Sequence, residues 1–230
     1  MLSHVHDSCS GNSPVSEADI AGFIMRRFDE ESLTTDHPPI VAANEHASDP
    51  HYSPEKGKDS FFKKGDVVLI DLWAKFKNPS NSIYADETWM GFLGEEVPDK
   101  VLEVWELVRD ARKAGYKLAK ERFDAGETVY GWEVDDATRK PIVDAGYGEY
   151  FIHRTGHSIT TVDHGSGANI DNLETLESRP LIPNTIFSIE PGVYLPDFGV
   201  RSEFDVLVTK DGKITAAEGT DQDDLIKIKI

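Results

Sequence analysis

Residues 67–76 read VVLIDLWAKF, a run of branched and aromatic side chains with Asp71 in its middle. Such a run predicts a buried strand. Because side chains alternate across a strand, Asp71 lies on the same face as Leu69 and Trp73. Both faces of the strand are apolar, so Asp71 is not simply a solvent-facing residue. A lone carboxylate buried there must take up a proton or find a partner.

A second strand-like run follows the turn-forming residues 77–82, which read KNPSNS. Residues 83–94 read IYADETWMGFLG and carry a second embedded acid, Asp86. Two strands joined by turn residues predict an antiparallel hairpin. The hairpin therefore holds two carboxylates at positions where a core is expected.

The remaining elements are predicted from apolar periodicity. Helices are expected over residues 17–29, 98–123 and 133–145. Ser16 is the expected N-cap of the first helix, and Pro141 should give the third a kink or a late start. Strands are expected over residues 39–44, 186–195, 200–209 and 213–216. Two hairpins with helices between them predict an α+β fold in which helices pack on one curved antiparallel sheet.

Length and composition narrow the function. The 230 residues are typical of one large domain or two small ones, and a hydrophobic content of 39% suffices for a core. Acidic residues number 42 against 24 basic ones, for a formal net charge of −18. A phosphate-binding surface needs clustered lysine and arginine, so nucleic acid is not an expected partner.

Other features of the sequence indicate the compartment. No stretch approaches the roughly 18–20 apolar residues of a membrane-spanning helix, so no membrane partner is expected. The opening residues, MLSHVHDSCSGNSP, lack the basic and apolar regions of a secretory signal. The single cysteine, Cys9, excludes an internal disulfide and fits a reducing compartment. A cytoplasmic protein is expected, with residues 1–15 as a loose tail.

Two further acids lie in the strand-like runs of the last third, Glu190 in IFSIEPG and Glu203 in VRSEFDVLV. Any one of the four embedded acids could pair with an arginine or accept backbone hydrogen bonds. Strand-embedded cations are too few for all four, and Arg201 is the clearest of them. Bound metal ions satisfy clustered carboxylates better than one arginine does.

Imidazoles accompany the acids, since HRTGHSITTVDHG places His153, His157 and His164 within twelve residues. A lone buried histidine is usually structural, but three together beside four embedded acids favour a metal site. Four carboxylates and one histidine carry a charge of −4, which two divalent cations neutralise. Oxygen-rich ligands with one nitrogen suit manganese, cobalt, iron or zinc. The residues themselves therefore predict a two-metal hydrolytic site.

Five sequence motifs follow one another along the chain: VLIDLW, YADETW, RTGHSI, SIEPGVYLP and GVRSEFDVLV. Together they resemble the pita-bread metallopeptidases, the superfamily of methionine aminopeptidase, Xaa-Pro aminopeptidase and prolidase. The resemblance runs from about residue 16 to the end of the chain. It implies the pita-bread form of an α+β fold, with helices on the outer face of the curved sheet, and one catalytic domain over residues 16–230.

The resemblance also implies a ligand set. Asp71 matches the carboxylate that holds one metal, while Asp86 and Glu203 resemble the bridging carboxylates. His157 and Glu190 resemble ligands of the second metal. In such enzymes the metals lower the pKa of a bridging water that attacks the scissile carbonyl, and the acid that Glu190 resembles also shuttles the proton. Two divalent ions are expected, manganese first, with cobalt, zinc or iron as alternatives.

Four further residues match outer positions of the family's site. His51, in the loop SDPHYSP, resembles a substrate-contacting or proton-donating histidine, and His164 resembles the one that steadies the tetrahedral intermediate. His153, four residues before His157, resembles the proline-specific members, whereas methionine aminopeptidases generally lack it. Arg201 resembles the arginine that orients an acid ligand in the proline-specific branch.

Some features depart from the family pattern. Ser-Ile-Thr follows His157 in place of a glycine-rich continuation, and Trp89 follows Thr88 where a basic residue is common. Asp71 and Asp86 are separated by a longer hairpin turn than usual. Proline-specific members usually carry an N-terminal domain over the site, but only one helix is expected here before the first site strand. The chain is therefore expected to be a catalytic domain alone.

The leading prediction is a dinuclear peptidase that cleaves the bond between an N-terminal residue and proline. Its expected partner is a peptide with proline at the second position, and a homodimer is a compatible assembly. One alternative is an enzyme similar to methionine aminopeptidase. The others are a catalytically inactive binding protein on the same fold and a hydrolase or lyase acting on small molecules.

Overall fold

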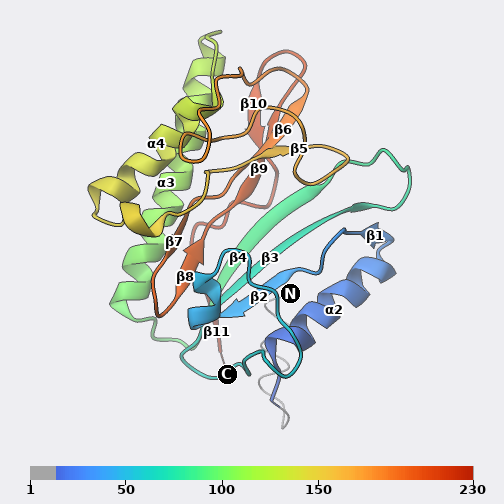
Figure 1. Ribbon diagram of the computed structural model, residues 1–230, viewed down its shortest axis with the longest axis vertical. Helices are drawn as coiled ribbons and strands as arrows, with labels where there is room; N and C mark the ends of the chain where they lie inside the picture. The colour runs from blue at the N-terminus through green and yellow to red at the C-terminus, as the bar shows by residue number, and fades with distance from the viewer. Residues whose placement is uncertain (1–13, 230) are drawn as a thin grey trace.

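The computed structural model describes residues 14–229, so most of the expected tail, including Cys9, lies outside the described residues. The helices are α2 (Glu17–Glu30), α3 (Asp99–Asp124) and α4 (Gly131–Asp144), with 3₁₀ helices η1 (Asn44–Ser48) and η2 (Gly148–Tyr150). Figure 1 shows α3 and α4 side by side along one flank of the strands, with α2 on the opposite flank. Within the described residues, no helix has the length and apolarity that crossing a membrane requires.

The predicted hairpin forms the centre of the first sheet. This sheet consists of β1 (Leu33–Thr34), β2 (Ile40–Ala43), β3 (Val67–Phe76), β4 (Ala85–Leu93) and β11 (Ile226–Ile228). The hairpin register places Asp71 opposite Thr88 and Trp73 opposite Asp86. The two carboxylates therefore lie on one face of the sheet. β11, which the sequence analysis did not predict, pairs with β4 in parallel.

The second half of the chain forms two further sheets. One contains β5 (Ser158–Ile159), β6 (Thr185–Ile189), β9 (Phe204–Val208) and β10 (Ile214–Ala216), and the other pairs β7 (Gly192–Tyr194) with β8 (Gly199–Arg201). The strands expected over 186–195 and 200–209 are thus each split in two. Pro191 has no N–H for a ladder, and Ser202 N–H donates to the Pro191 carbonyl at 3.2 Å instead of continuing the sheet. The chain therefore has three hydrogen-bonded sheets, one with a parallel pair, where one antiparallel sheet was expected.

Both faces of β3 are covered. Val68 and Ile70 pack with α2 residues such as Ile24, while Val67 and Leu69 pack with α3 residues such as Trp105. Helices therefore cover both sides of the first sheet at this strand. A third core joins the far end of α3 and α4 to β6, β9 and β10.

Two helix predictions were tested by the structure. Ser16 caps α2, because its hydroxyl accepts from Asp19 N–H at 3.3 Å and the Asp19 carboxylate accepts from Ser16 N–H at 3.2 Å. The late start expected for the third helix is wrong, since α4 begins at Gly131, ten residues before Pro141. The Glu133 carboxylate accepts from Tyr130 N–H at 3.0 Å and starts the helix upstream of the proline.

Candidate metal centre and active site

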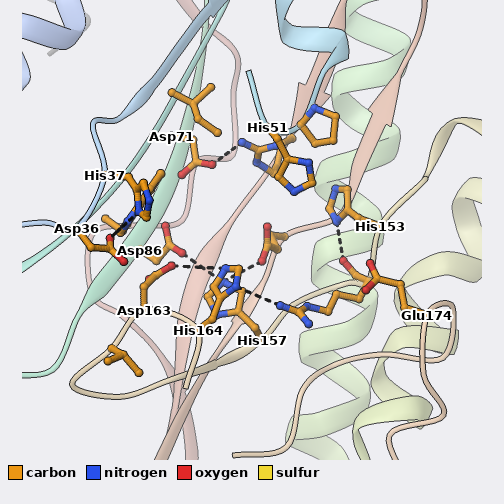
Figure 2. A pocket seen from close by; sticks show the side chains of 17 residues that line it. Asp36, His37, His51, Asp71, Asp86, His153, His157, Asp163, His164 and Glu174 are labelled. Carbon is orange, nitrogen blue, oxygen red and sulfur yellow. Dashed lines mark hydrogen bonds and ion pairs between the residues drawn. The ribbon is translucent and has the colours of Figure 1, made fainter. Parts of the chain in front are cut away.

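A pocket of about 560 Å³ contains most of the site predicted from the sequence (Figure 2). Eight of the nine predicted residues line it: His51, Asp71, Asp86, His153, His157, His164, Glu190 and Arg201. The ninth, Glu203, is 1% exposed and lies behind the pocket wall. Elements far apart in the sequence thus bring all the predicted residues to one place.

The breaks between strands position the glutamates. Glu190 follows the last residue of β6, and Glu203 precedes the first residue of β9. The Glu190 N–H donates to the Thr155 carbonyl at 2.7 Å, which ties this break to the segment that carries His157. His157 N–H donates in turn to the Ser188 hydroxyl at 3.0 Å. The splitting of the predicted strands is therefore part of how the site is built.

Three of the predicted ligands form a tight group. The ligand atoms of Asp86, His157 and Glu203 all lie within 4.8 Å of one another. His157 Nε2 is 3.4 Å from Asp86 Oδ2 and 3.3 Å from Glu190 Oε1. His157 Nδ1 faces the Ser158 carbonyl at 3.4 Å, which makes Nδ1 the protonated nitrogen of a neutral ring. The Nε2 lone pair then points at carboxylate oxygens, an arrangement that a cation between them would relieve.

Unpartnered oxygens support the same interpretation. Asp71 Oδ1, Asp86 Oδ1 and Glu203 Oε1 are buried, and none has a hydrogen-bond partner among the described residues. Leaving a buried polar atom without a partner costs about 1–3 kcal/mol, and more when the group is charged. Carboxylate oxygens with a single imidazole are ligands that divalent metals accept. The residues present therefore fit the binding of divalent cations.

The pKa directions follow from this crowding. Burial, and then the charges of Glu203 and Asp71, hold the pKa of Asp86 well above its ordinary value. Burial and the charge of Glu190 raise the pKa of Glu203 in the same way. Burial raises the pKa of Glu190 to about 7, although the Arg201 charge opposes the shift. Each of these shifts favours the uncharged acid, so positive charge brought close to the carboxylates would be strongly favourable.

Arg201 is buried and donates hydrogen bonds to side chains on three strands, β3, β4 and β7. Its Nη2 donates to Asp71 Oδ2, its Nη1 to the Tyr194 hydroxyl at 2.9 Å, and its Nε to the Thr88 hydroxyl at 3.0 Å. The Thr88 hydroxyl donates to Glu203 Oε2 at 2.7 Å. Arg201 therefore contacts one predicted ligand directly and reaches a second through Thr88.

His153 extends this network. Its Nδ1 lies 2.6 Å from the Arg154 carbonyl and must carry a proton, because a carbonyl only accepts. Its Nε2 then accepts from the Tyr194 hydroxyl at 2.7 Å, while that hydroxyl accepts from Arg201. Burial, and then the Arg201 charge, lower the pKa of His153 to about 3, so the ring is neutral at pH 7.

The other two outer histidines lie nearer to solvent. His164 is exposed, and its ring lies against that of His157 with 4.1 Å between the ring centroids. Desolvation, and then the charge of His157, lower the pKa of His164 to about 4. His51 is also exposed and lines the pocket from the loop after η1.

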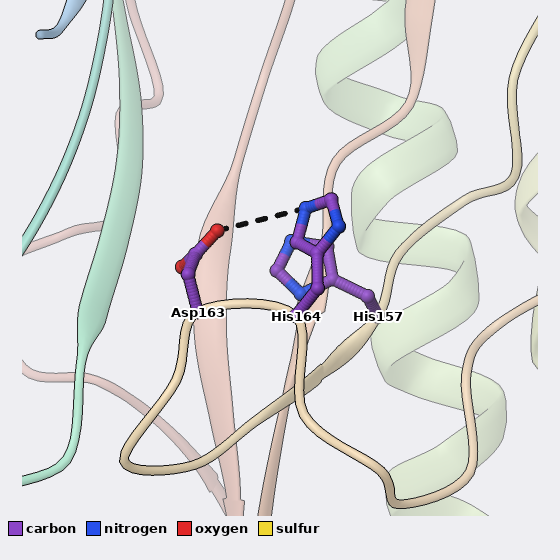
Figure 3. Close-up of side chains that lie close together, drawn as sticks. All are labelled: His157, Asp163 and His164. Carbon is purple, nitrogen blue, oxygen red and sulfur yellow. Dashed lines mark ion pairs between the residues drawn. The ribbon is translucent and has the colours of Figure 1, made fainter. Parts of the chain in front are cut away.

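Several residues of this site were not predicted from the sequence. Asp163 is 8% exposed, lies 3.5 Å from His164 Nε2 and forms a second candidate ligand group with His157 and His164 (Figure 3). Burial raises its pKa to about 6. Its position next to His164 in TTVDHG was the available signal. Thr88 and Tyr194 gave no signal of their own, because hydroxyl residues are common in strands.

A partly buried ion pair on α4 fixes the segment before His157. Arg139 contacts Asp135 at 3.1 Å and donates to the His153 carbonyl at 2.8 Å. Asp135 accepts from the N–H groups of Thr155 at 3.0 Å and Asn172 at 3.1 Å. This pair holds the loop that carries His153, and it was also missed from the sequence.

Comparison with known proteins gives consistent results. Residues 2–210 match Metallopeptidase family M24. The chain is 35% identical to the Xaa-Pro dipeptidase of Lactobacillus delbrueckii subsp. lactis over 181 residues, which is 78% of this chain and 44% of the relative. Such curated relatives are about twice as long as the chain, which spans roughly half of them.

Solved structures agree on the fold. A prolidase from Thermococcus sibiricus is 30% identical with a TM-score of 0.80, over 98% of this chain and 57% of that one. An X-Pro aminopeptidase from Thermotoga maritima is 27% identical with a TM-score of 0.79, over the whole of this chain and 60% of that one. These likenesses confirm the pita-bread α+β fold.

Proposed function

The chain belongs to metallopeptidase family M24, and we propose that it hydrolyses the peptide bond between an N-terminal residue and proline. One observation carries the proposal: Asp86, His157 and Glu203 converge beside an open pocket with carboxylate oxygens that lack partners. The names of its relatives, which include Xaa-Pro dipeptidase and prolidase, favour proline specificity. His153 favours the same branch, as the sequence indicated.

We assign five residues to two divalent metals: Asp71, Asp86, His157, Glu190 and Glu203. When bound, such ions lower the pKa of water and polarise a carbonyl oxygen. Four carboxylates with one imidazole favour manganese, with cobalt, zinc or iron as alternatives. In this assignment Arg201 holds Asp71 in place, and Thr88 orients Glu203.

The chain's own groups supply the remaining chemistry. Glu190 lines the pocket and resembles the acid that shuttles the proton in the family, so it is suited to holding and returning a proton. The leaving group is the ring nitrogen of proline, which needs such a proton. His51 and His164 line the pocket from its exposed side, where they can donate hydrogen bonds to a peptide carbonyl. His153 acts through Tyr194, whose hydroxyl it contacts.

We further propose that residues 16–230 form one catalytic domain and that the chain acts in the cytoplasm. The five sequence motifs and the compact network around Arg201 support a single domain. A homodimer remains the proposed assembly.

The test is an assay of metal-stripped protein with Mn²⁺ added back. Mass spectrometry follows the cleavage of an Xaa-Pro dipeptide, an Xaa-Pro-Xaa tripeptide and Met-Ala-Ser. We expect metal-dependent release of the residue before proline and a loss of at least 100-fold in kcat/KM for Asp86→Asn and His157→Ala. Glu87→Gln is the matched control, since Glu87 is the neighbour of Asp86 on β4 and lies outside the pocket.

Each other result has a defined meaning. Faster cleavage of Met-Ala-Ser than of any proline substrate would show a methionine aminopeptidase. Metal binding without cleavage of any peptide would favour the inactive binding protein. Full activity in either site variant would overturn the ligand assignment.

A further inference from the structure

The walls of the pocket are strongly acidic. Six carboxylates line it, from Asp36, Asp71, Asp86, Asp163, Glu174 and Glu190, against the guanidinium groups of two arginines, Arg154 and Arg201. A substrate carrying a negative group is repelled by such a surface unless a cation receives that group. The two arginines are therefore the protein groups that decide whether an anionic substrate binds.

Arg201 is buried and already hydrogen-bonded to side chains of the site. Its three guanidinium nitrogens donate to Asp71, Tyr194 and Thr88, and the residue is 2% exposed. It holds the site together from a buried position, and each of its guanidinium nitrogens already donates to a side chain of the site. A negatively charged group of the substrate therefore needs another cation of the pocket as its partner.

Arg154 differs from Arg201 both in its exposure and in its partners. It is half-buried, it lines the pocket, and no carboxylate of the described residues forms an ion pair with its guanidinium. The contact that its guanidinium makes is from Nη2 to His164 Nδ1, at 3.4 Å. A neutral imidazole at that distance is a weak acceptor and occupies one of five N–H donors. Most of the guanidinium is available to a ligand.

Arg154 is also close to the candidate metal centre. The His164 ring that it contacts lies against the ring of His157, with 4.1 Å between centroids. In an Xaa-Pro dipeptide, the free carboxylate lies one residue beyond the scissile bond. A short ligand spanning the centre and Arg154 fits this arrangement.

Resting on the proposed function, we propose that Arg154 binds the free α-carboxylate of the proline in an Xaa-Pro dipeptide, and so selects dipeptides over longer peptides. A planar guanidinium matches a carboxylate with two parallel hydrogen bonds. In a longer peptide or an amide, a neutral amide replaces that carboxylate. The guanidinium then loses its charged partner, while the acidic walls remain.

The test compares Ala-Pro with Ala-Pro-amide in the Mn²⁺-loaded protein. The wild type should prefer the free acid. Arg154→Gln should lower kcat/KM for Ala-Pro by tenfold or more, chiefly through KM, and should lower it far less for the amide. Arg154→Lys should recover part of the loss. Arg179→Gln is the control, since Arg179 is an exposed arginine that pairs with Glu177 outside this pocket.

Calorimetry keeps the inference separate from catalysis. Wild-type protein should bind proline at least tenfold more tightly than prolinamide, and Arg154→Gln should bind the two equally. This preference without turnover of either substrate would contradict the proposed function and support the role of Arg154. Equal binding in the wild type, or an equal loss for acid and amide in Arg154→Gln, would overturn the role of Arg154 even if peptides are cleaved.

Discussion

Arg201 is the cation that lies beside the buried carboxylates of the site. Its guanidinium pairs with Asp71, while burial holds the pKa values of Asp86 and Glu203 well above their ordinary ranges. Removing one member of a buried pair leaves the other charge uncompensated, at a cost of about 3–5 kcal/mol. We therefore expect Arg201→Met to lower the free energy of unfolding of the metal-free protein by that amount, as measured by urea denaturation.

Bound Mn²⁺ should reduce this loss, because the metal supplies Asp71 with another partner. Arg154→Gln is the matched control and should cost less, since Arg154 has no carboxylate partner among the described residues. An Arg201→Met protein as stable as the wild type without metal would show that Arg201 does not hold Asp71 in place.

Site residues whose chemistry conflicts with their place in a strand could be predicted from the sequence. Site residues that suit their strand could not. Asp71 and Asp86 stood out because a carboxylate is costly in an apolar strand. Tyr194 and Thr88 fit their strands without any such conflict, so their hydrogen bonds to Arg201 appear only once β4, β7 and β8 are folded together. Arg154 was likewise indistinguishable from a surface arginine.

At the scale of elements, the packing of α3 against α4 depends on Gly115. A Cβ added there would lie 2.0 Å from Thr138 Oγ1 on α4. Alanine favours a helix over glycine by about 1 kcal/mol, but overpacking costs about 1–3 kcal/mol. Because the Thr138 hydroxyl is held by the Val134 carbonyl at 2.8 Å, we expect the clash to dominate and Gly115→Ala to lower Tm.

Gly22 on α2 provides the opposite case. A Cβ there would meet the flexible end of Arg26 at 3.7 Å, an ordinary contact. Gly22→Ala should therefore raise Tm. Comparing Gly22→Ala with Gly115→Ala separates the effect of helix propensity from the effect of packing. The Gly115→Ala, Thr138→Ala double variant should recover much of the loss. A higher Tm for Gly115→Ala alone would contradict the close approach of the two helices.

Elements with strong local patterns were predicted almost to the residue. β3 has the predicted bounds, α2 ends one residue later than predicted, and α3 begins and ends one residue later. β11 was missed because its three residues, Ile226–Ile228, pair with β4 far away in the sequence, and a short parallel strand has no turn signal. The breaks at Glu190 and Glu203 were missed because local propensity there favours continuous strands, while hydrogen bonds to distant segments end them.

The protein contains more acidic side chains than its basic side chains can neutralise. This excess determines how the stability of the fold depends on pH. Burial raises the pKa of Glu190 to about 7 and that of Asp205 to about 8, whereas both are ionised in the unfolded chain at pH 6.5. The folded state therefore binds more protons, and stability falls as pH rises. Below pH 6.5 the lowered pKa values of His153 and His164 act in the opposite direction.

Between pH 7.5 and 8.5 these histidines are almost entirely neutral in both states, because the ordinary histidine pKa is about 6.5, so the carboxylates determine the slope. In chelator, we expect the free energy of unfolding to fall by about 1–2 kcal/mol over this interval in urea titrations. Asp205→Asn should give a shallower fall, since an amide oxygen still accepts from Asp86 N–H but does not titrate. Saturating Mn²⁺ should remove or reverse the fall, because metal binds the ionised carboxylates. Stability that stays level or rises with pH in chelator would show that these acids are not held protonated by the fold.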